Sequence, residues 1–192
     1  QARIDRANQD VRVIAEKGTV MLNSPFETTL YLDVDTIIMR PLDNFMQRAL
    51  DCDVLATPLS WKHYSSFGDG QPETWPMLMA GVVFYSKHFR QIYKSYIDIY
   101  KDVIPRLPTQ EQTILSLTCH QESSQLKVVE DSTLQFDVLN AQQHFALATY
   151  PCIGDCVDIS CSELERFHIF HYNDKKPQYM QQIKNVWGIS AD

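Results

Sequence analysis

Two aspartates separated by one residue come directly after an apolar run. Residues 28–34 predict a buried strand that leads into Asp33-Val34-Asp35. Because residues two apart in a strand project from one face, we expect Asp33 and Asp35 to face one site at the strand's carboxyl end, where ligands bind in open α/β sheets. Two carboxylates suit a hard cation, Mg²⁺ or Mn²⁺, which keeps other positions for water and phosphate oxygens. The alternative interpretation is a solvated strand end without a ligand.

A second group of polar side chains follows a late apolar run, residues 167–171. In a strand, His168 and His171 lie on opposite faces, so at most one of them faces a metal. His171 stands at the end of the run beside polar and lysine residues, and we predict it as the third ligand. His168 is interpreted as a core histidine with a satisfied hydrogen bond. Lys175 and Lys176 would place positive charge on a diphosphate leaving group, or else belong to a solvated turn.

The cysteine count is odd, so at least one thiol is free or pairs outside this chain. Three of the five lie close together in the sequence, and they predict either buried small side chains, a local disulfide in an oxidising compartment, or a zinc site completed by a histidine. The choice between a secretory (Golgi) lumen and the cytoplasm therefore stays open. The cysteines are Cys52, Cys119, Cys152, Cys156 and Cys161.

The length and net charge of the chain limit the kinds of function it can have. The 192 residues predict a single domain, residues 1–192, and 44% hydrophobic residues are enough for a core. A net charge of -7 disfavours nucleic acid as a partner, because an acidic chain repels phosphate backbones. No apolar run approaches the ~20 residues that cross a bilayer, so we expect no membrane segment in this chain. Because the first residue is Gln1, we expect a cut chain.

Strand-like and helix-like segments alternate along the chain. This alternation predicts an α/β fold with a mixed, mostly parallel sheet flanked by helices. The expected strands are 28–34, 53–57, 78–85, 128–130 and 167–171, with a loop rich in Gly, Pro, Ser and Trp over 60–76. The expected helices are 5–18 (ending at Gly18), 41–50, 87–104 and one that begins with 109–117. Helical spacing places one side of 41–50 together, namely Leu42, Phe45, Met46 and Leu50, and turns one side of 87–104 inward, namely Phe89, Ile92, Tyr96 and either Ile99 or Tyr100.

Four motifs in a fixed order resemble those of one enzyme family and cover roughly residues 20–180. They are the acidic strand end Tyr31–Thr36 with Pro41-Leu42 after it, the strand Met79–Tyr85, the helix start Thr109–Gln112, and the segment His171–Pro177. Each is similar to a motif of the GT-A nucleotide-diphospho-sugar transferases, in particular glycosyltransferase family 8. The resemblance implies a GT-A-like, Rossmann-related fold that binds a nucleotide sugar through an Asp-x-Asp motif and Mn²⁺ or Mg²⁺.

The resemblance assigns roles around the metal and the diphosphate. Asp33 and Asp35 would bind the metal and the diphosphate, and His171 would be the third metal ligand. Lys176 would contact the leaving phosphate. Because the Lys-Pro pair comes one residue earlier than in the family pattern, Lys175 is an alternative to Lys176.

The resemblance also assigns residues to the sugar side of the site. Gly81 would allow the backbone to approach the sugar or acceptor closely, because it has no side chain. Glu111 and Gln112 would lie near the donor sugar. The chain departs from the family pattern at Met79, where the family usually has Asn, and at Glu111, where it usually has Asp.

The resemblance implies a donor, UDP-sugar above other nucleotide sugars, and a glycan, protein or small-molecule hydroxyl acceptor. Only 32 residues precede Asp33, whereas the family has one or more βαβ units there, so we expect a domain truncated at its N-terminal side. Two other functions are alternatives for this chain. One is a catalytically inactive GT-A-like binding module. The other is a phosphatase of the haloacid dehalogenase type, in which the first aspartate is the nucleophile.

Overall fold

The computed structural model describes residues 17–65, 73–100, 110–137, 152–153, 156–157 and 166–171. Of residues 60–65, 73–76, 110–111, 136–137, 152–153 and 156–157 it describes the backbone alone. The chain divides into two compact units, residues 1–31 with 45–131 and residues 32–44 with 132–192. The single domain expected from the chain length stays a prediction.

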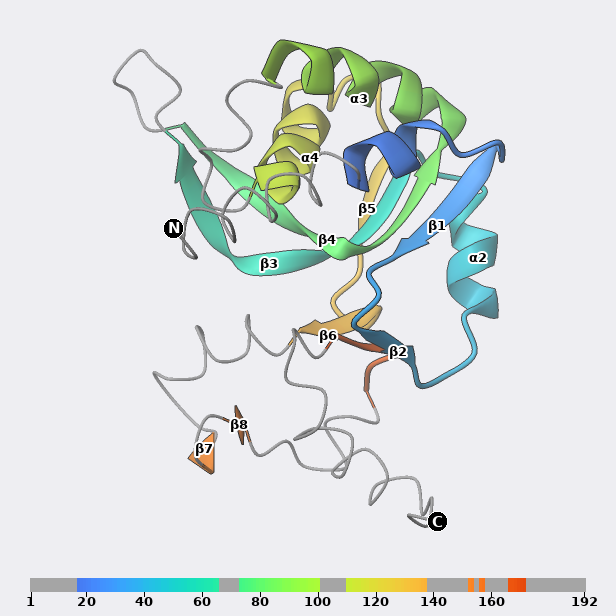
Figure 1. Ribbon diagram of the computed structural model, residues 1–192, viewed down its shortest axis with the longest axis vertical. Coiled ribbons are helices and arrows are strands. Elements are labelled where there is room, and N and C mark those ends of the chain that lie inside the picture. Colours follow the sequence, from blue (N-terminus) through green and yellow to red (C-terminus); the bar gives the residue numbers. More distant parts are fainter. Residues whose placement is uncertain are drawn as a thin grey trace, which may run out of the picture. The chain divides into compact units, whose positions relative to one another are not determined.

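The elements are named as in Figure 1, which labels all of those given below except β9. The first unit contains most of β1 (Thr28–Leu32) and α2 (Asp43–Ala49), and all of β3 (Val54–Ser65), β4 (Glu73–Ser86), α3 (Lys87–Tyr100), α4 (Gln110–Gln121) and β5 (Val128–Glu130). The second unit contains β2 (Thr36–Ile38), β6 (Gln135–Asp137), β7 (Cys152–Ile153), β8 (Cys156–Val157) and β9 (Ile169–His171).

The sheet of the first unit has the strand order β1-β4-β3-β5. Strand β3 is antiparallel to β4, from the pair Val54↔Tyr85 to the pair Ser65↔Glu73, and parallel to β5. Helices α3 and α4 lie on the same side of the β3–β4 pair, and α4 packs against both β4 and α3 (Figure 1). This arrangement buries the apolar side of α3.

The expectation of a mostly parallel sheet is wrong, because the described sheets are mixed and mostly antiparallel. In the first unit, β3 and β4 follow each other in the chain and pair antiparallel over most of their length. Strands that are adjacent in sequence and joined by a short connection pair in this way, whereas parallel pairing needs a crossover of a dozen or more residues. The prediction of a loop over 60–76 is wrong for residues 60–65 and 73–76, whose backbone is strand. With these residues taken as a loop, the antiparallel pairing of β3 with β4 was not predicted.

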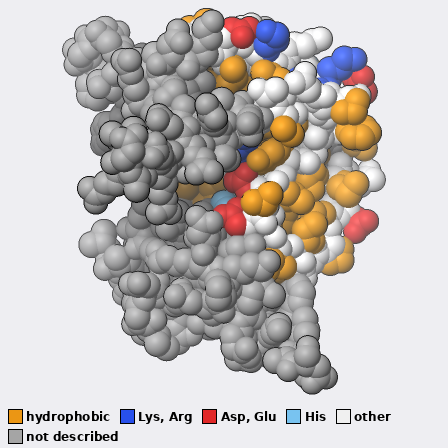
Figure 2. Space-filling view, viewed as in Figure 1, with side chains coloured by type: hydrophobic (Ala, Val, Ile, Leu, Met, Phe, Trp, Pro, Cys, Tyr) orange, Lys and Arg blue, Asp and Glu red, His pale blue; other side chains and the backbone are white. Residues whose placement is uncertain are grey.

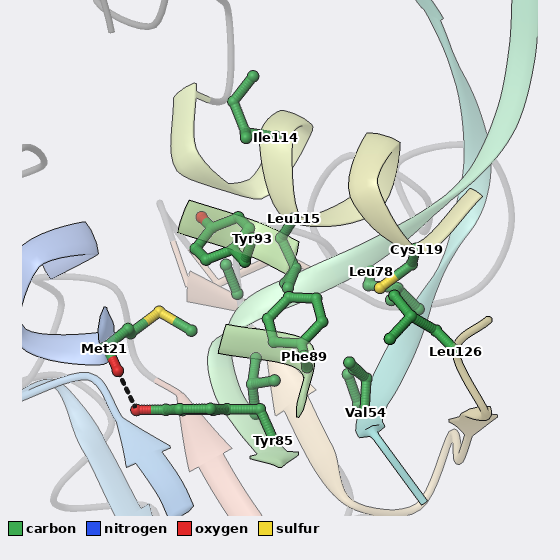
Figure 3. Packing of buried hydrophobic residues seen from close by; sticks show 13 residues of the cluster. Met21, Val54, Leu78, Tyr85, Phe89, Tyr93, Ile114, Leu115, Cys119 and Leu126 are labelled. Atoms are coloured by element: carbon green, nitrogen blue, oxygen red, sulfur yellow. Dashed lines mark hydrogen bonds between the residues drawn. The ribbon is translucent and has the colours of Figure 1, made fainter. Parts of the chain in front are cut away.

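The first described helix covers residues 17–22, so the prediction that Gly18 ends it is wrong. The helix ends instead at Asn23, whose backbone and side-chain N–H groups both donate to the Thr19 carbonyl, at 3.1 and 2.9 Å. Met21 is 2% exposed, and its carbonyl accepts a hydrogen bond of 3.1 Å from the Tyr85 hydroxyl (Figure 3). Packing of Met21 on the core therefore outweighs the weak helix propensity of glycine.

The core of the first unit is built around α3. The Phe89 and Tyr93 rings are fully buried and stack with their centroids 5.1 Å apart. In Figure 3 they lie among side chains from β4 and α4, including Leu115. The prediction that Phe89 faces inward is confirmed. Ile99, an alternative inward position, is 68% exposed, and Tyr100 packs inward in its place.

Helix α2 confirms the predicted helix over 41–50 with shorter bounds. Phe45 and Ala49 are buried, as is Leu42 just before the helix. Met46 and Leu50 were expected on the same buried side, yet they are 56% and 66% exposed. Figure 2 shows such apolar side chains reaching the described surface among polar and charged ones. Single exposed apolar side chains of this kind are ordinary in folded proteins.

Two cysteines of the first unit are free thiols, Cys52 and Cys119, and both are buried. Burial, together with the nearby negative charge of Glu130, raises the pKa of Cys119 to about 12. Burial likewise raises the pKa of Cys52. Because the thiolate is the reactive form, Cys119 behaves as an inert apolar side chain. The zinc and disulfide interpretations concern the side chains of residues 152, 156 and 161, which are not among the described side chains.

Arg90 is a buried cation in α3 whose guanidinium donates to two backbone carbonyls, those of Ser24 and Phe26. We expect Arg90→Lys to lower the free energy of unfolding by about 1–3 kcal/mol, because an ammonium cannot satisfy both carbonyls in the planar fork geometry of arginine. Urea unfolding followed by circular dichroism measures the change. The matched control is Lys94→Ala, which removes an exposed pair with Asp98 and is expected to cost under ~1 kcal/mol. Equal costs would contradict the anchoring role of Arg90.

The described part of the second unit contains a three-stranded sheet of order β2-β9-β6 and the pair β7–β8. Strand β9 is central, antiparallel to β2 and parallel to β6. Ile169 and Phe170 are fully buried, as is Leu134 just before β6. A central strand needs apolar residues on both faces, which explains the two successive apolar residues before His171, Ile169 and Phe170.

Candidate metal centre

The acidic pair lies in a turn between β1 and β2. Strand β1 ends at Leu32 and β2 begins at Thr36, so the prediction that the strand continues to residue 34 is wrong. The Thr36 backbone N–H and hydroxyl both donate to the Asp33 carbonyl, at 3.2 and 2.7 Å, and hold the turn closed. The Val34 side chain is fully exposed, whereas the side chains of Asp33 and Asp35 are each 23% exposed. The turn therefore directs Val34 to solvent and both carboxylates inward.

The second unit brings three predicted residues together. Asp33, Asp35 and His171 each offer one ligand atom, and these atoms all lie within 4.8 Å of one another. The Nε2 atom of His171 is 2.9 Å from Oδ1 of Asp35 and 4.0 Å from Oδ2 of Asp33. The register of the sheet accounts for this, since His171 ends β9 directly opposite Thr36, the first residue of β2.

The spacing of the three donor atoms fits a small divalent cation. An octahedral ion with ligands at ~2.1 Å separates adjacent ligand atoms by ~3 Å and opposite ones by ~4.2 Å. The distances of 2.9 and 4.0 Å from His171 Nε2 to the two carboxylates fall near these values. Mn²⁺ readily accepts a donor set of two carboxylate oxygens and one imidazole nitrogen. Mg²⁺ prefers the two carboxylate oxygens over the nitrogen. That these residues bind a metal stays a prediction.

His168 lies apart from this group. Its Nδ1 atom is hydrogen-bonded to the Pro41 carbonyl at 2.8 Å, and its own carbonyl accepts from the backbone N–H groups of Met39 and Arg40. The expected hydrogen bond is present, but the residue is only partly buried and is not a core histidine. The side chain thus secures the segment between β2 and α2.

Gln135 contacts the group and was not predicted from the sequence. It is the first residue of β6, is 1% exposed, and has its amide Nε2 3.0 Å from Nδ1 of His171. Its backbone is fixed by parallel pairing with β9, opposite Ile169. A three-residue strand with one glutamine carries no recognisable pattern, and only the pairing with β9 reveals the contact.

Two residues predicted on the sugar side, Gly81 and Gln112, belong to the first unit. Gly81 is buried in β4. The Gln112 side-chain carbonyl accepts a hydrogen bond of 3.3 Å from the backbone N–H of Ala80, the residue before Gly81. Met79, where the family pattern has Asn, is 4% exposed and packs in an apolar cluster. The other predicted positions lie outside the described side chains: Glu111, Lys175 and Lys176.

Among the described residues, no helix has the length and apolar character needed to cross a membrane.

Comparison with known proteins relates the chain to glycosyltransferases by structure. No family model matches the sequence, and no curated protein sequence matches it. The glycosyltransferase GlyE of Streptococcus pneumoniae TIGR4 matches with a TM-score of 0.50 and 21% identity, over 83% of this chain and 37% of GlyE. The galactosyltransferase LgtC, in complex with donor and acceptor sugar analogues, gives a TM-score of 0.48 and 16% identity, over 94% of this chain and 67% of LgtC. An active-site mutant of LgtC matches with a TM-score of 0.47 and 16% identity, over 88% of this chain and 64% of the mutant.

These similarities are similarities of fold. The chain spans between 37% and 67% of the length of these solved proteins. At 21% identity, the likeness to GlyE concerns the course of the backbone. The mixed α/β fold of this chain thus matches that of a glycosyltransferase, which confirms, at the level of fold, the resemblance to GT-A glycosyltransferases indicated by its motifs.

Proposed function

We propose that this chain is the metal-dependent catalytic part of a glycosyltransferase, which moves a sugar from a nucleotide-diphosphate donor, most simply a UDP-sugar, to a hydroxyl acceptor. The observation that carries the proposal is the convergence of Asp33, Asp35 and His171 within 4.8 Å. The fold shared with the glycosyltransferase GlyE supports it.

In the proposed reaction the acidic turn and the end of β9 act on the leaving group. Asp33, Asp35 and His171 would hold Mn²⁺ or Mg²⁺. A bound divalent cation neutralises the negative charge that develops on the departing diphosphate. The two carboxylates are held by a turn that Thr36 closes, so little reorganisation is needed. Lys176, or Lys175, would donate to a phosphate oxygen and add to this stabilisation.

On the sugar side we propose that Gln112 orients the donor sugar. Its side-chain carbonyl accepts from the Ala80 N–H, so its NH₂ group is left to donate to a sugar hydroxyl. Gly81 follows Ala80 in β4 and would let the backbone approach the sugar or acceptor. Glu111, the neighbour of Gln112 at the start of α4, is proposed to lie near the same sugar.

The test is calorimetric titration of Mn²⁺, then of UDP and GDP with and without Mn²⁺. We expect wild-type protein to bind UDP only when Mn²⁺ is present, and the double variant Asp33→Ala/Asp35→Ala to bind neither. The matched control is Asp98→Ala, an exposed carboxylate on α3, which should bind like wild type. UDP binding that needs neither Mn²⁺ nor the two aspartates would refute the metal centre. Absence of Mn²⁺ and UDP binding by the wild type would favour the inactive binding module.

A further inference from the structure

The buried amide of Gln135 and the carboxylate of Asp35 contact opposite nitrogens of the His171 ring. Asp35 Oδ1 is 2.9 Å from Nε2, and Gln135 Nε2 is 3.0 Å from Nδ1. All three residues belong to the second unit. His171 is 7% exposed and Gln135 is 1% exposed, so water has little access to the Nδ1 side of the ring.

The chemistry of these partners determines which ring nitrogen carries the proton. An ionised carboxylate only accepts hydrogen bonds, so His171 donates from Nε2 when it pairs with Asp35. In the neutral ring Nδ1 is then an acceptor, and it accepts from the amide N–H of Gln135. The arrangement is self-consistent for the Nε2–H tautomer.

Metal ligation through Nε2 requires the opposite tautomer. The Nε2 lone pair must face the cation, so the ring proton resides on Nδ1. A histidine ligand almost always donates this other N–H to a protein acceptor, and such partners strengthen metal binding 10–100-fold. Gln135 contacts Nδ1, and it meets this need when its carbonyl oxygen faces the ring.

We propose that Gln135 is a positioning residue that serves both tautomers of His171, an inference that rests on the proposed metal centre. An amide carries a donor and an acceptor in one plane, so a half-turn about its last bond exchanges N–H for carbonyl without moving the rest of the side chain. In the first orientation His171 is bonded to Asp35. In the second, Gln135 holds the Nδ1–H form, and both His171 Nε2 and Asp35 are available as ligands.

The sheet keeps this pair of side chains in place. Strands β6 and β9 are parallel, with Gln135 opposite Ile169 and Asp137 opposite His171. The pairing continues before β6, where the Ile169 and His168 N–H groups donate to the carbonyls of Leu134 and Thr133, at 3.0 and 3.1 Å. The backbones that carry the amide and the imidazole are therefore joined by one ladder, and the amide can turn while the backbone stays fixed.

The direct test is the tautomer of His171, read from long-range ¹H–¹⁵N NMR of the wild-type protein. We expect the Nε2–H pattern without metal and the Nδ1–H pattern when Zn²⁺, a diamagnetic cation, is added. The variant Asp33→Ala/Asp35→Ala is the control, and it should show no metal-induced change. A ring that keeps the Nε2–H pattern while the wild type binds Zn²⁺ at these aspartates would overturn the inference, and this measurement needs no change at Gln135.

Substitutions then separate the amide's role from simple packing. We expect Gln135→Met, of similar shape but with only a weakly accepting sulfur in place of the amide oxygen, to weaken Mn²⁺ binding 10–100-fold, as measured by electron paramagnetic resonance. Gln135→Glu keeps an acceptor for Nδ1–H and should bind Mn²⁺ within a few-fold of wild type. Equal Mn²⁺ affinity of wild type and Gln135→Met would overturn the role of Gln135 and leave the metal centre standing. Absence of Mn²⁺ binding by the wild type would overturn the proposed function itself, and this inference with it.

Discussion

Replacing Asp35 by asparagine is expected to lower the metal-dependent release of UDP from a UDP-sugar by about 10³-fold, which corresponds to roughly 4 kcal/mol. The variant removes one anionic ligand from the group formed with Asp33 and His171. Asparagine has nearly the same shape, and its carbonyl can still accept from His171 Nε2, so the fold should persist. The measurement is the rate of UDP release at saturating Mn²⁺, together with the Mn²⁺ affinity.

The matched control is Asp43→Asn, another aspartate of the second unit. Asp43 is exposed in the first turn of α2, where a negative charge interacts favourably with the helix dipole. Its loss should cost under ~1 kcal/mol of stability and leave the rate of UDP release unchanged. If Asp35→Asn released UDP as fast as Asp43→Asn, the acidic turn would not take part in the reaction.

Replacing Phe89 by alanine is expected to lower the free energy of unfolding by about 3–5 kcal/mol. The ring is fully buried, stacks on Tyr93 at 5.1 Å and also packs 6.3 Å from the ring of Tyr85. Its removal leaves a cavity between α3, α4 and β4 that these large rings cannot collapse to fill. Urea unfolding followed by circular dichroism measures the loss.

Ile99→Ala on the same helix is the control for Phe89→Ala. Ile99 is 68% exposed, and its truncation should change the free energy of unfolding by no more than ~0.5 kcal/mol. Phe89→Ala changes the buried side of α3, and Ile99→Ala changes its exposed side. Similar losses in the two variants would mean that the buried side of α3 is assigned wrongly.

The candidate site was only partly predictable from the sequence. Asp33, Asp35 and His171 were identified by residue type, since carboxylates and an imidazole next to apolar runs suggest a metal site. The reason given for the acidic pair, alternation along a strand, was wrong, because both residues lie in a turn. The convergence depends on the pairing of Thr36 with His171, which joins segments 135 residues apart in the chain.

The direction of the strands depends on the chain's connections. Local patterns predicted strands at 53–57 and 78–85, and both are present within β3 and β4. The residues between them were interpreted as a loop because they are rich in Gly, Pro, Ser and Trp, yet β3 and β4 extend into this segment as an antiparallel pair. Side-chain composition indicates burial and turn preference, but it does not show which strands pair or in which direction they run.

The sequence by itself determined where most of the helices lie, the apolar positions Phe89, Ile169 and Phe170, and the residue types of the candidate metal centre. These follow from local periodicity and from the chemistry of single side chains. The tertiary structure alone decided the antiparallel pairing, the turn that directs two carboxylates inward, and the contact of Gln135 with His171. The contact of Gln135 with His171 joins two separate segments of the chain, and the antiparallel pair and the turn are set by backbone hydrogen bonds, which residue types alone do not reveal.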